Sequence, residues 1–410
     1  MRKNYLNFIS LSKFLSFYSE NIIIFLLPII TYRFFHKIED SGLIIFFHFL
    51  FRLLGYPVSG ILCDRLDEKK IITAVAFIRG IFFLSLFSLY NLWNPENHSL
   101  LFILLSFLSS ADGFAGGVAS IAFETTGPKL YPHSKFRDFQ VSTQTADQCA
   151  LLLAPATGAF ILDAFGSSLT LATVSTLFLC SGITFLPCLK LKNIETDPNL
   201  PMMINSGGLI QTPLDTVRAI LKNRLILITL GMTILDNFLL GLYSALLVPL
   251  SLNIFHESEK NLGWVLTFGY FASMGAIHWS HWIQKKKSTL WLWKWSYTIA
   301  YLGFFLMGLA PNFIIYAISI LLIETSCASG IFALRLIRSE IIPKYNFGKI
   351  SGILFLLQQI TIPLGGLVIA TFHHPEHLQN LILFSAGITG TLTLILMIIE
   401  FKEIKFTSLK

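Results

Sequence analysis

The chain has 410 residues, of which 54% are hydrophobic and only 13% are charged, and its mean hydropathy is +0.68. An average soluble domain carries about 25% charged residues, so this composition argues against a soluble enzyme, a nucleic-acid binder or a disordered protein. The 38 phenylalanines suit a surface that faces lipid, and the predicted class is an integral membrane protein. The net charge of +7 has to be judged from where the charges lie.

In chain order, twelve apolar stretches reach the length of about 20 residues that a membrane-crossing helix needs. They are 10–33, 42–62, 71–92, 99–123, 141–164, 169–189, 225–252, 262–283, 291–310, 313–337, 349–371 and 379–400. The longest polar connection, 190–224, separates the sixth stretch from the seventh, and its part 212–223 is expected to form a short amphipathic helix at the membrane surface. The predicted fold is therefore all-α, with six-helix bundles at 1–190 and 225–410 and a cytoplasmic linker at 191–224.

The distribution of lysine and arginine predicts the orientation. If both termini are cytoplasmic, 24 of the 30 basic residues fall in cytoplasmic segments. Basic residues favour cytoplasmic loops, so we expect a multi-pass protein of the cell membrane, here the inner membrane of a bacterium. The positive net charge then reflects orientation, and no nucleic-acid partner is expected.

The two halves carry similar polar residues at similar places. The first span contains Glu20 followed by Asn21, and the seventh contains Asp236 followed by Asn237. Two further correspondences at a similar offset pair Gln148 and Pro155–Gly158 with Gln358, Gln359 and Pro363–Gly366, and Asp112 with Glu324. Transporters are often built from duplicated halves with the substrate path at their interface. A duplication is therefore predicted, and chance coincidence is the alternative.

The loop after the second span reads GILCDRLDEKK from Gly60 to Lys70. This loop resembles the signature between helices two and three of the major facilitator superfamily. Asp67 and Glu68 stand where that signature usually has glycine and arginine. Gly60 lets a neighbouring helix approach closely, and Asp64 can cap a facing helix N-terminus or pair with a nearby arginine. Twelve spans with a central linker fit the same family.

The fifth span reads Ala-Pro-Ala-Thr-Gly over 154–158, which is similar to an element of drug and metabolite antiporters. The set of motifs looks most like the enterobactin-exporter branch of the superfamily, which exports siderophores and some drugs. The resemblance implies two bundles that rock around a central site and a cytoplasmic gate. The predicted gating residues are Gly60, Asp64, Arg65, Arg137, Pro155 and Gly158.

Acids within the spans are the candidates for proton coupling, because an ionisable group in a membrane is costly and is a functional candidate by default. In the superfamily, helices one, four, seven and ten line the cavity, and each carries an acid here. The predicted proton-coupling residues are Glu20, Asp112, Asp147 and Asp236, with Glu20 and Asp236 the strongest. The alternative is that some acids only pair with arginines and hold the bundle together.

Arg52 and Arg79 lie within the second and third spans and offer the planar donor fork that suits a carboxylate or phenolate. They favour an anionic substrate, unless they are structural partners of Glu20 or Asp112. The predicted substrate-binding residues are Arg52, Arg79, Tyr56, Gln148, Gln358, Gln359 and Glu324.

The predicted function is proton-coupled export of a small anionic metabolite, such as a siderophore, by alternating access. The expected partners are that substrate, membrane lipid and protons, and the protein is expected to act as a monomer without cofactor, metal or catalytic residue. The sequence contains no phosphate-binding loop, HExxH motif or nucleophile elbow, so an enzyme is not expected. A multidrug efflux transporter and an importer of a solute or metal chelate are the alternatives.

Overall fold

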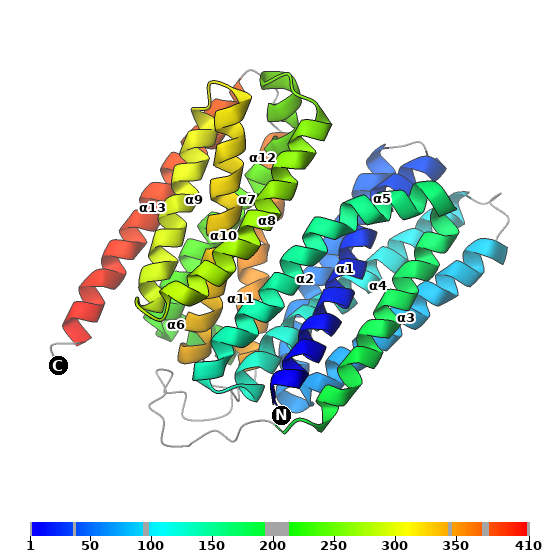
Figure 1. The fold of residues 1–410 in the computed structure, drawn as a ribbon, viewed down its shortest axis with the longest axis horizontal. Helices are drawn as coiled ribbons and strands as arrows, with labels where there is room; N and C mark the ends of the chain where they lie inside the picture. Colours follow the sequence, from blue (N-terminus) through cyan, green and yellow to red (C-terminus); the bar gives the residue numbers. More distant parts are fainter. Residues whose placement is uncertain are drawn as a thin grey trace. The chain divides into compact units, whose positions relative to one another are not determined.

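The computed structural model describes residues 2–35, 38–92, 98–192, 213–342, 347–370 and 377–407, and the regular structure in these ranges is helical (Figure 1). Each of the twelve predicted spans coincides with helix. The α-helices are α1 Arg2–Phe35, α2 Ile38–Arg65, α3 Glu68–Leu92, α4 His98–Leu130, α5 His133–Phe185, α6 Pro213–Lys222, α7 Arg224–Pro249, α8 Glu259–Ile283, α9 Thr289–Gly308, α10 Phe313–Ile341, α11 Phe347–Gln359, α12 Thr361–Ala370 and α13 Leu378–Thr407.

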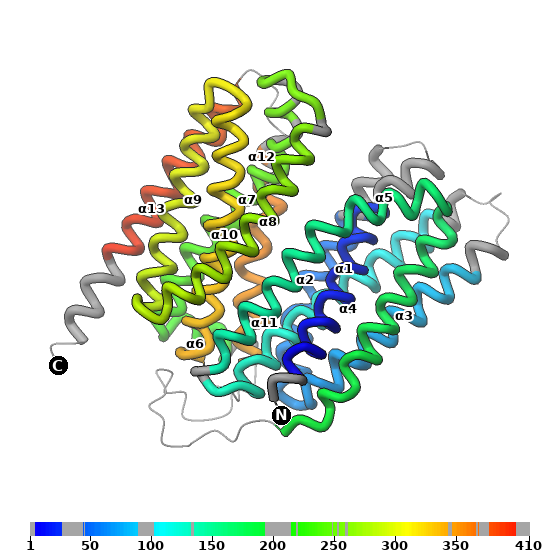
Figure 2. The backbone as a smooth tube through the Cα atoms, in the orientation of Figure 1, coloured from blue at the N-terminus to red at the C-terminus, as the bar shows by residue number. Residues whose placement is uncertain are grey.

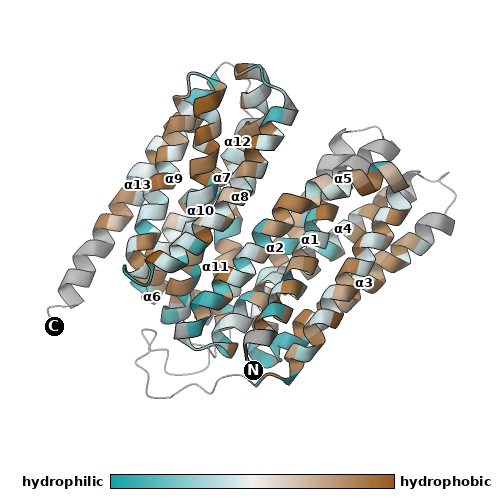
Figure 3. Cartoon of the chain, viewed as in Figure 1, coloured by the Kyte–Doolittle hydropathy of each residue, from teal (hydrophilic) through white to brown (hydrophobic). Residues whose placement is uncertain are grey.

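The surfaces of these helices are those of a protein in lipid. Within the described residues, nine helical stretches are long and apolar enough to cross a membrane. Large apolar side chains lie exposed along them, including Phe107, Ile314 and Phe384 at 65%, 69% and 70%. Figure 3 shows hydrophobic residues along the length of the helices and a hydrophilic turn between α8 and α9. A water-facing surface with this much exposed apolar area would aggregate.

Helix α5 contains the fifth and sixth predicted spans. A straight helix of 53 residues would be about 80 Å long, far more than the roughly 30 Å of a bilayer core. The helix is broken at Gly166, whose φ of 77° lies in the region that glycine tolerates best. The tube in Figure 2 shows the chain turning back there. The expected turn between 164 and 169 is confirmed, and glycine is its physical cause.

The eleventh predicted span, 349–371, is divided into α11 and α12 at Ile360. Pro363 explains the break, because proline has no N–H to donate to the carbonyl of residue 359 and its ring clashes with that carbonyl. The neighbouring carbonyl of Gln358 accepts instead from the Asn237 amide at 2.8 Å and the Thr361 hydroxyl at 3.0 Å. The break therefore presents a backbone acceptor to helix α7.

The chain divides into two compact units. Unit 1 comprises Met1–Leu200 with Pro343–Ile353, and unit 2 comprises Pro201–Ile342 with Leu354–Lys410. In unit 1, α1 packs against α5 and α2 packs against α4; in unit 2, α7 packs against α12 and α8 packs against α10. The same span positions pair in both halves, which is the arrangement of two pseudo-symmetric bundles.

The short helix α6 lies within the segment 212–223 that was expected to be helical and amphipathic. Thr216 and Ile220 are buried, whereas the side chains of Arg218 and Asp215 are 65% and 43% exposed. Helix α6 contacts α7, with which it shares unit 2. Much of the linker, 193–212, lies outside the described residues.

Candidate functional site: a paired charge cluster and a polar pocket

A buried charge cluster joins four helices of unit 1. Arg79 on α3 donates from Nε to Asp112 Oδ1 on α4 at 2.7 Å, and from Nη1 to Glu20 Oε2 on α1 at 3.0 Å. Arg52 on α2 donates to the other carboxylate oxygen of Glu20. Two arginines thus meet two acids, and opposite charges that share hydrogen bonds offset the cost of burying them.

The surroundings of the cluster hold its side chains in place. Arg79 lies over the Phe178 ring, 4.1 Å from guanidinium carbon to ring centroid, and Arg52 donates to the Tyr56 hydroxyl at 3.0 Å. A Cβ at Gly116 would lie 3.1 Å from Glu20 Oε2, so the small residue makes room for the carboxylate. Arg52, Arg79 and Tyr56, predicted to bind substrate, are therefore engaged with one another and with the acids of their own unit.

Asp147, predicted to couple protons, also has a basic partner. Its Oδ2 lies 2.6 Å from Nζ of Lys13, and both side chains are mostly buried. Gln148, one residue further along α5, has a buried Oε1 that accepts no hydrogen bond within the described part of the chain. Of the predicted acids in unit 1, Glu20, Asp112 and Asp147 are all in ion pairs.

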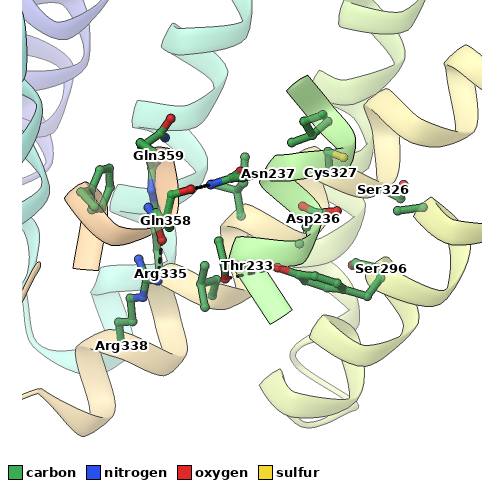
Figure 4. Close-up of a pocket in the computed structure, with 17 residues that line it drawn as sticks. Thr233, Asp236, Asn237, Ser296, Ser326, Cys327, Arg335, Arg338, Gln358 and Gln359 are labelled. Carbon is green, nitrogen blue, oxygen red and sulfur yellow. Dashed lines mark hydrogen bonds between the residues drawn. The ribbon is translucent and has the colours of Figure 1, made fainter. Parts of the chain in front are cut away.

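Unit 2 contains a polar pocket of about 120 Å³, formed by α7, α9, α10 and α11 (Figure 4). Asp236, Gln358 and Gln359 line it, and these three were predicted from the sequence. Figure 4 shows Arg335 and Arg338 towards one end, and Cys327 and Ser326 towards the other. The pocket thus has a basic end and an end that carries an acid.

Asp236 differs from the acids of unit 1. Its Oδ1 is buried and accepts no hydrogen bond among the described residues, which also provide no ion pair for it. Tyr297 of α9 and Cys327 of α10 lie close enough to interact with it electrostatically. An uncompensated carboxylate in a membrane-embedded pocket is costly unless it binds a proton or a cationic group.

The basic end of the pocket is organised by the break between α11 and α12. Arg338 donates to Gln358 Oε1 at 2.8 Å, while the backbone carbonyl of the same Gln358 accepts from Asn237. The close approach of α7 and α12 depends on glycine, because a Cβ at Gly241 would lie 2.2 Å from the carbonyl oxygen of Ile362. The break between α11 and α12 and the close contact at Gly241 together bring Asn237, Gln358 and Arg338 into one hydrogen-bond network.

Glu324, predicted to bind substrate, lies on α10 but is not among the residues that line this pocket. Its Oε1 accepts a hydrogen bond from the Tyr243 hydroxyl at 2.9 Å. Glu324 is one turn before Cys327, which interacts electrostatically with both Glu324 and Asp236. Asp236 and Glu324 therefore both lie near the same thiol.

The predicted gating loop is anchored to the start of α11, within unit 1. Asp64 Oδ2 accepts a hydrogen bond from the backbone N–H of Lys349 at 3.1 Å. A Cβ at Gly60 would lie 2.5 Å from the Gly348 carbonyl oxygen, so only glycine permits this approach. Among the partners considered for Asp64, the structure shows a helix N-terminus, whereas Arg65 is exposed. A carboxylate at a helix start is favoured by the helix dipole.

The two residues that depart from the signature also have local partners. Asp67 directly precedes α3, and its Oδ1 accepts from the Lys69 backbone N–H at 3.1 Å. Lys129 Nζ lies 3.2 Å from buried Glu68 and donates to the Cys63 carbonyl at 2.7 Å. Lysine from α4 thus compensates the extra acid and caps the end of α2.

The other predicted gating element lies where α5 meets α1. A Cβ at Gly158 would lie 3.4 Å from the Ile22 side chain, an ordinary contact distance. The Tyr18 and Thr157 hydroxyls are 2.5 Å apart across the same interface. Pro155 lies within α5.

Sequence reasoning did not assign the basic end of the pocket. Arg335, Arg338 and Cys327 were not among the residues predicted to bind substrate or to couple protons. The available signal was helical spacing, because Cys327, Ile331 and Arg335 follow at intervals of four and share one face of α10.

A family model described as "Major Facilitator Superfamily" matches residues 9–366 of the chain. The chain belongs to the major facilitator superfamily. A comparison with curated protein sequences finds no match. The expected enterobactin-exporter branch stays a prediction.

Solved structures share the fold of this transporter. A bacterial homologue of the iron transporter ferroportin, in the outward-facing state, has a TM-score of 0.76 at 14% identity, with 96% of this chain and 98% of that chain covered. The human organic anion transporter MFSD10 (TETRAN) has a TM-score of 0.73 at 15% identity, covering 96% and 99%. The proton:xylose symporter XylE has a TM-score of 0.70 at 16% identity, covering 97% and 94%.

Family and fold agree on what kind of protein this is. It is a multi-pass membrane transporter for small molecules with the major facilitator fold, and it is not an enzyme. Within the described residues, no group of three or more His, Cys, Asp or Glu side chains is arranged to hold a metal ion.

Proposed function

We propose that this transporter is a proton-coupled secondary exporter of a small metabolite with anionic groups, for which a siderophore is one candidate. It would act as a monomer in a bacterial inner membrane with both termini in the cytoplasm. The two bundles, 1–190 and 225–410, would rock about a central site to give alternating access, and residues 191–224 would link them.

The observation that carries the proposal is the contrast between Asp236 and the other predicted coupling acids. Glu20, Asp112 and Asp147 each have a basic partner, whereas the described residues provide none for Asp236. An acid held by a fixed arginine or lysine resists protonation, since the proton must compete with a permanent charge. Asp236 is therefore our first choice for the coupling residue, with Glu324 the second.

Arg335 supports an anionic group on the substrate. It is half-buried at the pocket, and its guanidinium fork suits a carboxylate or phenolate. Gln358 and Gln359 add amide groups to the same wall. In this assignment Arg52 and Arg79 stabilise unit 1 and do not bind the substrate.

The gating proposal rests on the loop after α2. Asp64 bonds the start of α11 and Gly60 permits the contact, which is the arrangement expected of a latch. Arg65 and Arg137 would support the latch electrostatically, and Pro155 and Gly158 would let α5 adjust against α1 during transport.

The test begins with the secreted metabolites of wild-type and deletion strains under iron limitation, which identify a candidate substrate. Purified protein in proteoliposomes is then assayed for flux of that compound driven by an imposed proton gradient. Asp236→Asn should abolish the gradient-driven flux and keep substrate exchange, because only proton coupling is removed. Unchanged gradient-driven flux in Asp236→Asn would exclude this residue as the coupling site.

The same assay separates the alternatives. Accumulation of the compound with the proton gradient, in the same direction, would indicate import. Efflux of structurally unrelated apolar dyes in place of the metabolite would indicate a multidrug transporter. The pocket lining does not favour a multidrug transporter, since its aromatic residues are limited to Tyr297 and Phe355.

A further inference from the structure

The turn between α8 and α9 carries three consecutive lysines, Lys285–Lys287, whose side chains are all exposed. Lysines elsewhere in the chain, such as Lys13, Lys69 and Lys129, have acids within ion-pair distance. The described part of the chain offers no such acid to this turn, and the sequence contains none from 260 to 323. Three positive charges of unit 2 are therefore left for an anionic partner from outside the chain.

Two of the three ammonium groups lie over tryptophan rings. Lys286 Nζ is 4.3 Å from the ring centroid of Trp282, in the last turn of α8, and Lys287 Nζ is 5.7 Å from that of Trp291, in the first turn of α9. A cation over an aromatic face is attracted to it, but the ring does not neutralise the charge or accept all three N–H donors. The turn therefore presents positioned ammonium groups that can still bind an anion.

Tryptophan gathers around this turn. Five of the seven tryptophans of the chain lie between 279 and 295, and Trp279, Trp282 and Trp295 are 53%, 49% and 48% exposed. Tryptophan is enriched where a membrane meets water, because its ring is apolar and its N–H is polar. The tryptophans thus assign the turn to the level of the lipid headgroups.

The two helices that lead away from the turn have apolar surfaces. Phe271 of α8 is 69% exposed and Leu302 of α9 is 59% exposed, and Figure 3 shows the hydrophilic turn at the end of these two helices. A ligand at this place meets positive charge at the turn and an apolar surface along the helices. That combination fits an amphiphile with an anionic head.

We propose that the turn between α8 and α9 is a binding site for an anionic phospholipid, whose phosphate lies against Lys285–Lys287 and whose acyl chains lie along the exposed side chains of α8 and α9. Lysine suits this place, because its stem packs on apolar surface while its charge reaches the headgroups. A zwitterionic phospholipid fits less well, since its own ammonium is repelled by three lysines. This inference goes beyond the proposed function and depends neither on Asp236 nor on the direction of transport.

The start of α9 adds to the positive potential at the turn. Its first turn contains no acid, and the Ser288 hydroxyl accepts the Trp291 N–H at 3.2 Å. The N-terminal end of a helix carries a partial positive charge that favours a nearby phosphate. Lysines and helix dipole therefore act in the same direction.

The experiment measures which lipids lie next to these tryptophans. Bromine atoms on a lipid chain quench tryptophan fluorescence by contact, so quenching reports the local amount of the brominated lipid. A Trp93→Phe, Trp264→Phe background leaves only the tryptophans between 279 and 295. The purified full-length protein is placed in phosphatidylcholine nanodiscs that contain either brominated phosphatidylglycerol or brominated phosphatidylcholine at the same mole fraction.

We expect brominated phosphatidylglycerol to quench as strongly as brominated phosphatidylcholine at about one fifth of its mole fraction, because each lysine near the surface contributes to the attraction of anionic lipid. The preference should decrease when salt is raised from about 0.1 M to about 1 M, which shortens the Debye length from about 10 Å to about 3 Å. Equal quenching by the two lipids at low salt would overturn the proposal.

A triple variant tests whether the lysines of the turn cause the preference. Lys285→Gln, Lys286→Gln, Lys287→Gln should bring the ratio of the two lipids to about one. The matched control, Lys70→Gln, Lys190→Gln, Lys192→Gln, removes the same charge from exposed lysines of unit 1 and should keep the preference. Circular dichroism and size-exclusion chromatography verify that both variants are folded.

Three further results would contradict the proposal. A preference that survives in the variant of the turn would show that these lysines do not bind the lipid. An equal loss in the control variant would show that only the net charge of the protein matters. Loss of the preference on addition of glycerol 3-phosphate, at constant ionic strength, would indicate a site for a soluble phosphate ester instead of a lipid. None of these measurements involves transport, so their outcome is independent of proton-driven flux.

Discussion

Arg79 and Asp112 form an ion pair in which Nε and Oδ1 are 2.7 Å apart and both side chains are 1% exposed. The residues lie 33 positions apart, on α3 and α4. Arg79 also bonds Glu20 on α1, so one guanidinium joins three helices of unit 1. Loss of the contacts of Arg79 is therefore expected to lower the stability of the folded protein.

We expect Asp112→Asn to destabilise the protein by about 3–5 kcal/mol, because it leaves Arg79 buried with one anionic partner fewer. The double variant Arg79→Gln, Asp112→Asn should lose less than the sum of the single losses, since it removes both charges. Thermal unfolding of the four proteins of this cycle, followed by circular dichroism in one detergent, measures the coupling. Strictly additive losses would mean that the pair has no interaction energy of its own.

Gly166 allows α5 to turn back, and its substitution tests the cause of the break. Gly166→Ala should destabilise the protein by about 1 kcal/mol, because alanine is strained at a φ of 77° although nothing lies within 4 Å of the added Cβ. The matched control is Gly387→Ala on α13, where the space is equally open and the backbone is helical. That control should be neutral or slightly stabilising. Equal melting temperatures for the two variants would contradict this account.

The contact between Asp64 and the start of α11 predicts a local effect on amide exchange. Asp64→Ala removes the acceptor of the Lys349 N–H, and loss of a comparable helix cap costs about 1 kcal/mol. Hydrogen exchange followed by mass spectrometry should therefore be faster in a peptide that covers 347–353. Asp67→Ala, at the start of α3, is the control that should leave this peptide unchanged.

Gly60→Ala should have a larger effect on the same peptide. The added methyl would lie 2.5 Å from the Gly348 carbonyl oxygen, so backbone has to move. Gly275→Ala on α8, with nothing within 4 Å, should show wild-type exchange there. Normal exchange in Gly60→Ala would show that the close approach is not needed for this contact.

Arg335 and Arg52 should differ in what their substitution changes. Arg335→Gln should raise the KM of an anionic substrate about tenfold, because it removes one charged contact to the ligand. Arg52→Gln should lower the melting temperature, because Glu20 loses a partner. Concentration-dependent flux in proteoliposomes and thermal unfolding separate the two outcomes. If only Arg52→Gln raised the KM, the substrate would instead be bound by Arg52 in unit 1.

The path of the chain was largely predictable. Hydropathy located all twelve spans because the need for about 20 apolar residues is local in sequence. The interruption between 164 and 169 and a helix within 212–223 were also anticipated, from the limits of the apolar stretches and from amphipathic spacing, whereas the role of Gly166 was not. The division of the eleventh span was not anticipated. The sequence shows Pro363 there, but membrane helices often contain proline without breaking.

The sequence by itself determined the family, the class and the number of spans, since composition, periodicity and the signature loop are properties of contiguous residues. It identified the acids in the membrane but left open which of them carry fixed partners. Only the tertiary structure decided that Arg79 meets Asp112 and Glu20 while Asp236 meets no basic side chain in the described residues. Partner choice depends on which helix faces come together, and that packing joins residues tens or hundreds of positions apart.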